Sequence, residues 1–209
     1  MKNKTIKIYD STLRDGAQTK GVSFSIDDKL RILDILMDIG VDYIEAGWPG
    51  ANPIDDELFK NLPAKFKSKV VAFGMMRKKN KSASNDPGLN AVLNSGVSTT
   101  CLVGKSWDFH VKSALRISNS ENLEMINDSI DYASTKLDEV MFDAEHFFDG
   151  YKSNPKYSLD VIKTAWNAGA KWIVLCDTNG GTLPYELSSI INDVKNIIPQ
   201  ENLGVHFHN

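Results

Sequence analysis

The chain has 209 residues and a formal net charge of −3, with 24 Lys and Arg against 27 Asp and Glu. This balance lacks the positive excess that binding to a phosphate backbone usually requires, so it argues against a nucleic-acid partner. Hydrophobic residues make up 42% of the chain and charged residues 24%, which is typical of a globular protein. No apolar run reaches the ~18 residues that a membrane-spanning helix requires.

Short runs of β-forming residues alternate along the chain with longer segments of helical period. Strands are predicted at residues 5–10, 43–47, 69–73, 99–103, 139–143, 172–176 and 203–207. Helices are predicted between them at residues 27–39, 54–61, 85–94, 119–137, 158–168 and 184–198. The first helix carries an apolar stripe made of Leu30, Leu33, Ile35, Leu36 and Ile39. No change in composition marks a linker, so we expect one domain over residues 1–209.

The N-terminal sequence MKNKTIKIYD alternates polar and apolar residues and has no apolar core of the kind found in signal peptides. The two cysteines, Cys101 and Cys176, each lie in an apolar strand-like run. We therefore expect small buried thiols and no disulfide, and a location in the reducing cytoplasm.

Two fold classes accommodate this alternation, an open doubly wound sheet and a parallel (β/α)₈ TIM barrel. A nucleotide-binding open sheet would normally have a Gly-rich turn after its first strand, whereas this chain has STLRDGAQ there. The chain is also shorter than the ~250 residues of a typical complete barrel. We therefore predict a (β/α) barrel truncated after strand seven, without its last β/α unit and without any C-terminal region.

Polar residues gather where the predicted strands end. In a parallel barrel these ends converge on one face, where the active sites of this fold lie. The residues concerned are Asp10, Arg14, Asp15, Glu45, Asp143, Glu145, His146, Asp177, Thr178, His206 and His208.

His206 and His208 are two residues apart on a strand, so both side chains point to one face, with Cα atoms about 6–7 Å apart. Such a pair can be hydrogen-bonded and structural, or it can share a metal ion. Asp15 on the same rim favours a metal, and two nitrogens with a carboxylate suit Mg²⁺, Mn²⁺, Co²⁺ or Zn²⁺. Metal-dependent amidohydrolases also use His-x-His, but on strand one rather than strand seven.

Each of the other polar residues has a structural and a functional interpretation. Arg14 could form a surface salt bridge worth less than ~1 kcal/mol, or it could stabilise an oxyanion forming on a substrate. Thr178 could cap a loop or donate to a substrate carboxylate. Glu45, Asp143 and Asp177 could cap loops or orient neighbouring groups.

The motifs DSTLRDGAQ, IEAGWPG, FDAEHFFDGY, CDTNGGTLP and HFHN, in this order, resemble the acyl-CoA-dependent 2-oxo acid synthases and lyases of the metal-dependent barrel superfamily. That superfamily includes isopropylmalate, homocitrate and citramalate synthases and hydroxymethylglutaryl-CoA lyase. GWPG and DAEHFFDGY are most similar to the citramalate synthase type. The resemblance covers nearly the whole chain.

The resemblance implies that Asp15, His206 and His208 hold the divalent metal and that Arg14 polarises the 2-oxo group. It implies that Glu145 and Thr178 line the substrate pocket, and that Gln18 does so in a less defined role. The implied reaction is a Claisen-type condensation of acetyl-CoA with a small 2-oxo acid, pyruvate in the citramalate type, in isoleucine biosynthesis. The implied partners are these small molecules and a second subunit in a homodimer, with no nucleic acid or membrane.

Relatives of this type also carry an Asn ligand and a Gly-rich loop after strand eight, followed by a helical region, and none of these is present in this sequence. We therefore expect this chain alone to be inactive, and to be less stable than its parent or to self-associate. Two alternatives to the synthase stay open: a lyase of the same superfamily, and an inactive folding or interaction module.

Overall fold

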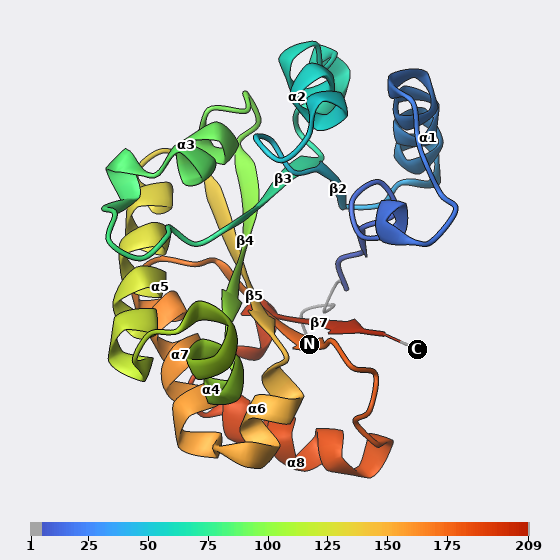
Figure 1. Ribbon diagram of the computed structural model, residues 1–209. Coiled ribbons are helices and arrows are strands. Elements are labelled where there is room, and N and C mark those ends of the chain that lie inside the picture. The colour runs from blue at the N-terminus through green and yellow to red at the C-terminus, as the bar shows by residue number, and fades with distance from the viewer. Residues whose placement is uncertain (1–5, 209) are drawn as a thin grey trace. The chain divides into compact units, whose positions relative to one another are not determined.

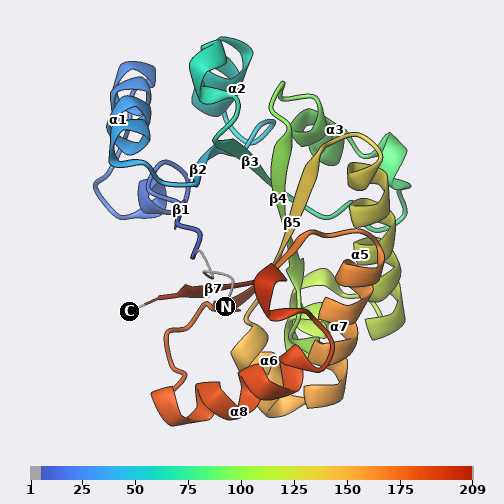
Figure 2. The ribbon, with the colours of Figure 1, turned by 180° about the vertical axis from the view of Figure 1, so that it is seen from behind.

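The computed structural model describes residues 6–208 (Figure 1, and from behind in Figure 2). Its strands are β1 (Tyr9–Asp10), β2 (Tyr43–Gly47), β3 (Val70–Met75), β4 (Thr99–Lys105), β5 (Glu139–Glu145), β6 (Trp172–Asp177) and β7 (Leu203–Phe207). Its α-helices are α1 (Ile26–Ile39), α2 (Pro53–Lys60), α3 (Pro87–Leu93), α4 (Asp108–His110), α5 (Asn119–Ser134), α6 (Phe147–Ser153), α7 (Pro155–Asn167) and α8 (Pro184–Lys195).

The described strands form one sheet in chain order, β1 to β7. Pairing is parallel between β1 and β2, β2 and β3, β5 and β6, and β6 and β7. Because parallel neighbours in chain order need a crossover between them, each strand is followed by helical structure before the next begins. This order confirms the predicted fold class, a parallel (β/α) barrel with seven strands.

The chain forms two compact units. Unit 1 consists of Met1–Gly74 and Pro87–Cys101, and unit 2 of Met75–Asp86 and Leu102–Asn209. Each has its own apolar core. In unit 1 the core includes Leu33, Ile44, Leu58, Val71 and Leu89, and in unit 2 it includes Ile126, Phe142, Phe147, Val161 and Leu175. The expectation of a single domain over residues 1–209 stays a prediction.

The predicted strands agree with the observed ones within about two residues, except that β1 begins only at Tyr9. The first residue of the prediction for β1, residue 5, lies outside the described residues. All six predicted helices are present as α1, α2, α3, α5, α7 and α8. The short helices α4 and α6, and a π-helical turn at Val111–Leu115, were not predicted.

Helix α1 begins at a capping box, in which the Ser25 side chain accepts from the Asp28 backbone N–H and Asp28 accepts from that of Ser25. Its buried face is narrower than predicted. Leu33 and Leu36 are buried, but Ile35 and Ile39 are exposed, so that part of the predicted stripe is wrong. The third buried position of the helix is a lysine, Lys29.

Helix α6 depends on a close approach at Gly150. A Cβ atom there would lie 2.6 Å from the carbonyl oxygen of Ser106 and 2.7 Å from Oγ of Ser158. Ser158 Oγ donates to that same carbonyl at 2.8 Å. The glycine, which a sequence analysis treats as a helix breaker, is therefore required by packing between α6, α7 and the end of β4.

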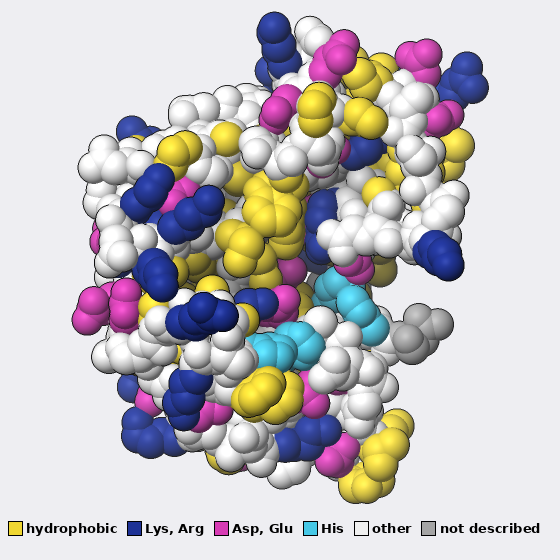
Figure 3. All heavy atoms as spheres, in the orientation of Figure 1, with side chains coloured by type: hydrophobic (Ala, Val, Ile, Leu, Met, Phe, Trp, Pro, Cys, Tyr) yellow, Lys and Arg dark blue, Asp and Glu magenta, His cyan; other side chains and the backbone are white. Residues whose placement is uncertain are grey.

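Both cysteines are buried thiols, as predicted. Between residues 6 and 208 no helix combines the length and apolar character needed to cross a bilayer. The four histidines all belong to unit 2, and imidazole side chains reach the surface on the face shown in Figure 3. They are His110, His146, His206 and His208.

Candidate metal and substrate site

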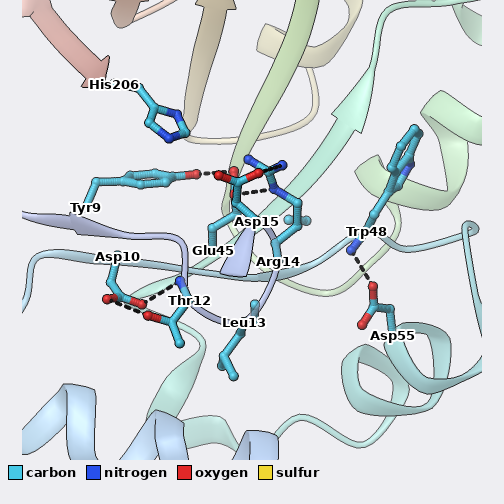
Figure 4. Close-up of polar contacts among 12 residues, drawn as sticks. Tyr9, Asp10, Thr12, Leu13, Arg14, Asp15, Glu45, Trp48, Asp55 and His206 are labelled. Carbon is cyan, nitrogen blue, oxygen red and sulfur yellow. Dashed lines mark hydrogen bonds and ion pairs between the residues drawn. The ribbon is translucent and has the colours of Figure 1, made fainter. Parts of the chain in front are cut away.

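Arg14 is held in unit 1 by a buried carboxylate (Figure 4). It follows β1, and its Nε donates to Glu45 Oε2 at 2.5 Å. Tyr9 Oη donates to the other oxygen, Glu45 Oε1, at 2.7 Å. The Arg14 side chain is 11% exposed and that of Glu45 is fully buried. The alternative of a surface salt bridge at Arg14 is therefore wrong.

An aromatic face supports the same guanidinium. Arg14 Cζ lies 4.0 Å from the centroid of the Phe73 ring, within the range of a cation–π contact. Trp48 packs edge-on against Phe73, with centroids 5.5 Å apart. Arg14 Nη1 also donates to Asp15 Oδ1 at 3.1 Å. Contacts at the edge and on the face of the guanidinium together fix its plane.

Arg14 and Gln18 line a cavity of about 390 Å³ that lies within unit 1. Gln18 ends a 3₁₀ turn, Gly16–Gln18, that follows the Arg14–Asp15 pair. Apolar and polar side chains complete the lining, among them Leu13, Phe24, Lys29, Trp48, Asn52 and Asp55. A cavity with a few polar groups and an apolar wall is typical of a small-molecule site.

Lys29 and Asp55 form a buried ion pair that the sequence analysis missed. Lys29 Nζ donates to Asp55 Oδ1 at 2.5 Å and to the carbonyl oxygens of Leu13 at 3.0 Å and Ala46 at 2.9 Å. Asp55 Oδ2 accepts from the backbone N–H of Trp48 at 2.9 Å. The pair ties α1 and α2 to the segments that follow β1 and β2. The sequence feature that could have indicated this pair is the helical spacing of Lys29 relative to the buried leucines of α1, Leu33 and Leu36, which places all three on one face.

Strand β7 brings the two predicted histidine ligands together in unit 2. The Nε2 atoms of His206 and His208 are 3.2 Å apart. Two nitrogens that bind one ion at about 2.1 Å are separated by about 3.0 Å at a right angle and about 3.4 Å at the tetrahedral angle. The two imidazoles form a hydrogen bond at this distance, which is the structural alternative. The observed separation also lies between the two values for a shared divalent ion, so both interpretations of the pair stay open.

Glu145, at the end of β5, forms an ion pair with Lys105 at the end of β4. Its carbonyl oxygen accepts from Ser106 Oγ at 2.6 Å and from the Ser106 backbone N–H at 3.3 Å. The backbone bonds fix the end of β5, and Lys105 orients the carboxylate. The sequence analysis did not predict a role for Lys105, because a lysine at the end of a strand is usually an ordinary surface residue.

Thr178 and Asp177 each accept hydrogen bonds from a backbone N–H group. Thr178 Oγ1 accepts from the backbone N–H of His146 at 2.9 Å, just before α6. Asp177 accepts from the backbone N–H of Thr182 at 3.0 Å and from its hydroxyl at 2.9 Å. The predicted loop cap is thus observed for Asp177, whereas the Thr178 hydroxyl bonds to a segment 32 residues earlier in the chain. A hydroxyl that accepts one bond can still donate its own hydrogen, which leaves the substrate role of Thr178 as a prediction.

His110 and His146 form an aromatic cluster with Trp107 that was not predicted. The His110 and His146 rings meet edge to face with centroids 4.4 Å apart, and Trp107 lies 4.9 Å from His110. Burial, followed by the neighbouring charges of His146 and Lys105, lowers the pKa of His110. The contact depends on α4 and α6, which the sequence pattern did not indicate.

The predicted site residues divide between the two units. Arg14, Asp15 and Gln18 belong to unit 1, and the remaining four to unit 2, namely Glu145, Thr178, His206 and His208. A metal ion shared by Asp15, His206 and His208 therefore stays a prediction.

A family model described as HMGL-like matches residues 5–209. The chain belongs to the HMGL-like family. It is 50% identical over 98% of its length to (R)-citramalate synthase of Aquifex aeolicus, and 48% identical over its whole length to that of Sulfolobus acidocaldarius. It is 30% identical to 2-isopropylmalate synthase of Sulfolobus acidocaldarius over 99% of its length. The chain spans about two fifths of the two citramalate synthases, 39% and 40% of their lengths.

Two solved structures share the fold of this chain. The hydroxymethylglutaryl-CoA lyase of Bacillus subtilis superposes with a TM-score of 0.77 at 19% identity, over 99% of this chain and 69% of that one. The lyase of Pseudomonas aeruginosa gives 0.77 at 22% identity, over 98% of this chain and 68% of that one. At these identities the likeness supports the barrel fold alone.

Proposed function

We propose that this chain is the catalytic barrel of an acyltransferase that condenses acetyl-CoA with pyruvate to give citramalate. The similarity to two (R)-citramalate synthases, at 48–50% identity over nearly the whole chain, supports the choice of substrates. The observation that carries the metal-dependent chemistry is the pair of Nε2 atoms, 3.2 Å apart, at the end of β7. The proposal includes a cytoplasmic homodimer that acts in isoleucine biosynthesis.

In this proposal, Asp15, His206 and His208 hold a divalent ion, Mg²⁺, Mn²⁺, Co²⁺ or Zn²⁺. When bound, the ion supplies Lewis-acid polarisation of the 2-oxo group. The fit rests on the donor set, two imidazoles and a carboxylate, which leaves coordination positions open for a chelating substrate.

The chain's own residues have distinct roles in the condensation. Arg14 donates hydrogen bonds to the 2-oxo oxygen as negative charge develops on it. Thr178 donates to the pyruvate carboxylate, and Gln18 lines the pocket. Glu145 accepts the methyl proton of acetyl-CoA, so that the resulting carbanion can attack the 2-oxo carbon, whose oxygen takes up a proton and becomes the hydroxyl. Water then hydrolyses the thioester, which releases citramalate and free CoA. Lys105 keeps the Glu145 carboxylate oriented through their ion pair.

Metal binding is tested by calorimetry with Mn²⁺ and Zn²⁺ on the wild-type chain and on the variant His206→Ala/His208→Ala. We expect weak binding of one ion to the wild type and no specific heat in the double variant. The matched control is His110→Ala, because His110 is also a half-buried histidine of unit 2 but lies outside the ligand set. Equal heats in wild type and double variant would show that the ligands are assigned wrongly.

Activity is tested by following thiol release from acetyl-CoA with a chromogenic disulfide reagent. The assay uses this chain and the product of the complete reading frame that contains it, with pyruvate, 2-oxoisovalerate and 2-oxoglutarate as acceptors. We expect release with pyruvate in the full product, and none with this chain alone. Preference for another acceptor would instead identify an isopropylmalate or homocitrate synthase. Cleavage of a hydroxyacyl-CoA without condensation would identify a lyase.

A further inference from the structure

Unit 2 holds a second group of side chains that offer metal-ligand atoms, and its donor chemistry differs from that of the histidine pair. Asp143 on β5, Cys176 on β6 and His206 on β7 each offer one ligand atom, and these atoms all lie within 4.8 Å of one another. The group contains a thiol, which none of the residues assigned to the proposed catalytic metal provides.

The sheet register explains why these three side chains converge. Cys176 is the register partner of His206 across β6 and β7. Asp143 is the partner of Val174, two residues before Cys176 on the same strand. Residues that pair across parallel strands, and residues two apart along a strand, point to the same face of the sheet. All three side chains therefore project from one face of three neighbouring strands.

We propose that Asp143, Cys176 and His206 form a site for a thiophilic divalent ion such as Zn²⁺, Cd²⁺ or Co²⁺. Sulfur, nitrogen and oxygen donors together are typical of zinc, whereas Mg²⁺ binds oxygen. In a tetrahedral zinc site such donors are about 3.3–3.6 Å apart, so adjustments of about 1 Å would close the site. Asp143 and Cys176 are buried, so the site lies in a low-dielectric environment. The Cys176 thiol, which donates to the carbonyl oxygen of Val174 at 3.8 Å, releases its proton to solvent when the ion binds. The bound cation then offsets the cost of a buried carboxylate and thiolate.

The shared ligand has a regulatory consequence, and this part rests on the proposed function. His206 belongs both to this group and to the pair with His208. An ion bound to Cys176 and Asp143 occupies His206, and two cations this close repel each other. An ion at the thiol site therefore competes with the ion of the proposed catalytic site for His206. Where the catalytic ion is Mg²⁺ or Mn²⁺, zinc bound through Cys176 acts as an inhibitor.

Titration with Co²⁺ tests the thiol ligand directly, because a cobalt–thiolate bond gives a charge-transfer band in the near ultraviolet. We expect the band in the wild-type chain, its loss in Cys176→Ser and its retention in Cys101→Ser, which alters the other buried thiol. His208→Ala should keep the band but lose Mn²⁺ binding. This separates the thiol site from the proposed catalytic site.

Asp143→Asn keeps the thiol and the side-chain shape. This variant should keep the band but bind Zn²⁺ at least about tenfold more weakly. Even mutations of residues that only hydrogen-bond to metal ligands lower metal affinity by about this factor. Circular dichroism confirms that each variant is folded. An undiminished band in folded Cys176→Ser, or no band in folded wild type, would overturn the proposal. If every variant, including His208→Ala, still bound Mn²⁺ as the wild type does, the proposed catalytic metal site would be contradicted instead.

Discussion

The guanidinium of Arg14 is fixed by three contacts of different kinds. Glu45 accepts from its Nε, Asp15 accepts from its Nη1, and the ring of Phe73 lies against its face. A lysine ammonium could replace the charge but not the plane, because it has no flat face to stack and no paired donors in a fixed orientation.

We expect Arg14→Lys to lower kcat on the order of 10²-fold in the product of the complete reading frame, with a smaller effect on KM. Steady-state kinetics with pyruvate and acetyl-CoA measure both. Arg77→Lys is the matched control, because Arg77 Nε also donates to a carboxylate, that of Asp128 at 2.6 Å, outside the assigned residues. A normal kcat with a raised KM would place Arg14 in substrate binding rather than in transition-state stabilisation.

His110 should make the stability of the chain depend on pH. Burial and the charges of His146 and Lys105 lower its pKa below the ordinary 6.5, against the opposing carboxylates of Glu145 and Asp149. Above 6.5 the imidazole is neutral in both folded and unfolded states. As the pH falls below that value the unfolded chain binds the proton first, so stability decreases until the folded pKa is passed.

Urea denaturation at about pH 7.5 and about pH 5.5 measures this effect. We expect the wild type to lose more stability between the two values than His110→Gln, in which the titrating group is absent. Protonation of other groups is common to both proteins and cancels in the comparison. An identical loss in both would mean that His110 titrates alike in the folded and unfolded chains.

For single residues, the sequence predicted which side chains lie on the same face of a strand, but it did not predict which charged side chains are buried. It indicated that His206 and His208 lie side by side, because a two-residue spacing on a strand fixes their common face. It could not indicate that Glu45 is buried beneath Arg14, or that Lys29 is buried, because both depend on partners that are distant in sequence. Those partners include the carbonyl oxygens of Leu13 and Ala46.

At the scale of elements, Lys29 connects four segments of unit 1. Removing its charge leaves Asp55 buried without a counter-ion and two carbonyl oxygens without a donor. We expect Lys29→Met to lower the free energy of unfolding by about 3–5 kcal/mol, the range found when one partner of a buried pair is removed.

Lys65→Met provides the control for this prediction. Lys65 also pairs with a carboxylate, that of Asp34, but its side chain is 60% exposed. Exposed pairs contribute less than ~1 kcal/mol, so this change should have little effect on urea denaturation. Similar losses in the two variants would show that burial of the Lys29–Asp55 pair adds nothing.

Long helices with a clear apolar period were predictable, and the short helices were not. The period of 3.6 residues identified α1, α5, α7 and α8, although it assigned Ile35 and Ile39 to the buried face of α1. Helix α6 is too short to show a helical period of apolar residues, and Gly150 within it is a residue type that disfavours helices. Its position depends on contacts with Ser106 and Ser158 that only the folded chain provides.

At the scale of the whole molecule, the alternation of strand and helix was enough to predict a parallel sheet in chain order. The rule that parallel neighbours need a crossover leaves few other arrangements for such a pattern. The sequence did not indicate the division into two compact units, because no change in composition marks it.

The strand order has a consequence for self-association. In the described sheet β7 is a terminal strand that pairs with β6. A terminal strand presents backbone N–H and C=O groups that can pair with another chain, and natural proteins often block such strands with lysine. β7 carries instead the apolar residues Val205, 53% exposed, and Phe207, 46% exposed.

We therefore expect the 209-residue chain to associate in a concentration-dependent way, and Val205→Lys to reduce this association. Multi-angle light scattering over a range of concentrations measures both. Ile39→Lys is the control, because Ile39 is also exposed but lies at the end of α1, where the backbone is not part of a sheet edge. If Ile39→Lys reduced association as much as Val205→Lys, general surface hydrophobicity would be the cause, because a lysine on α1 leaves the edge of β7 unchanged. A wild-type chain that stayed monomeric at every concentration would show that β7 is protected, and that an exposed apolar strand at the end of the sheet order does not suffice for pairing.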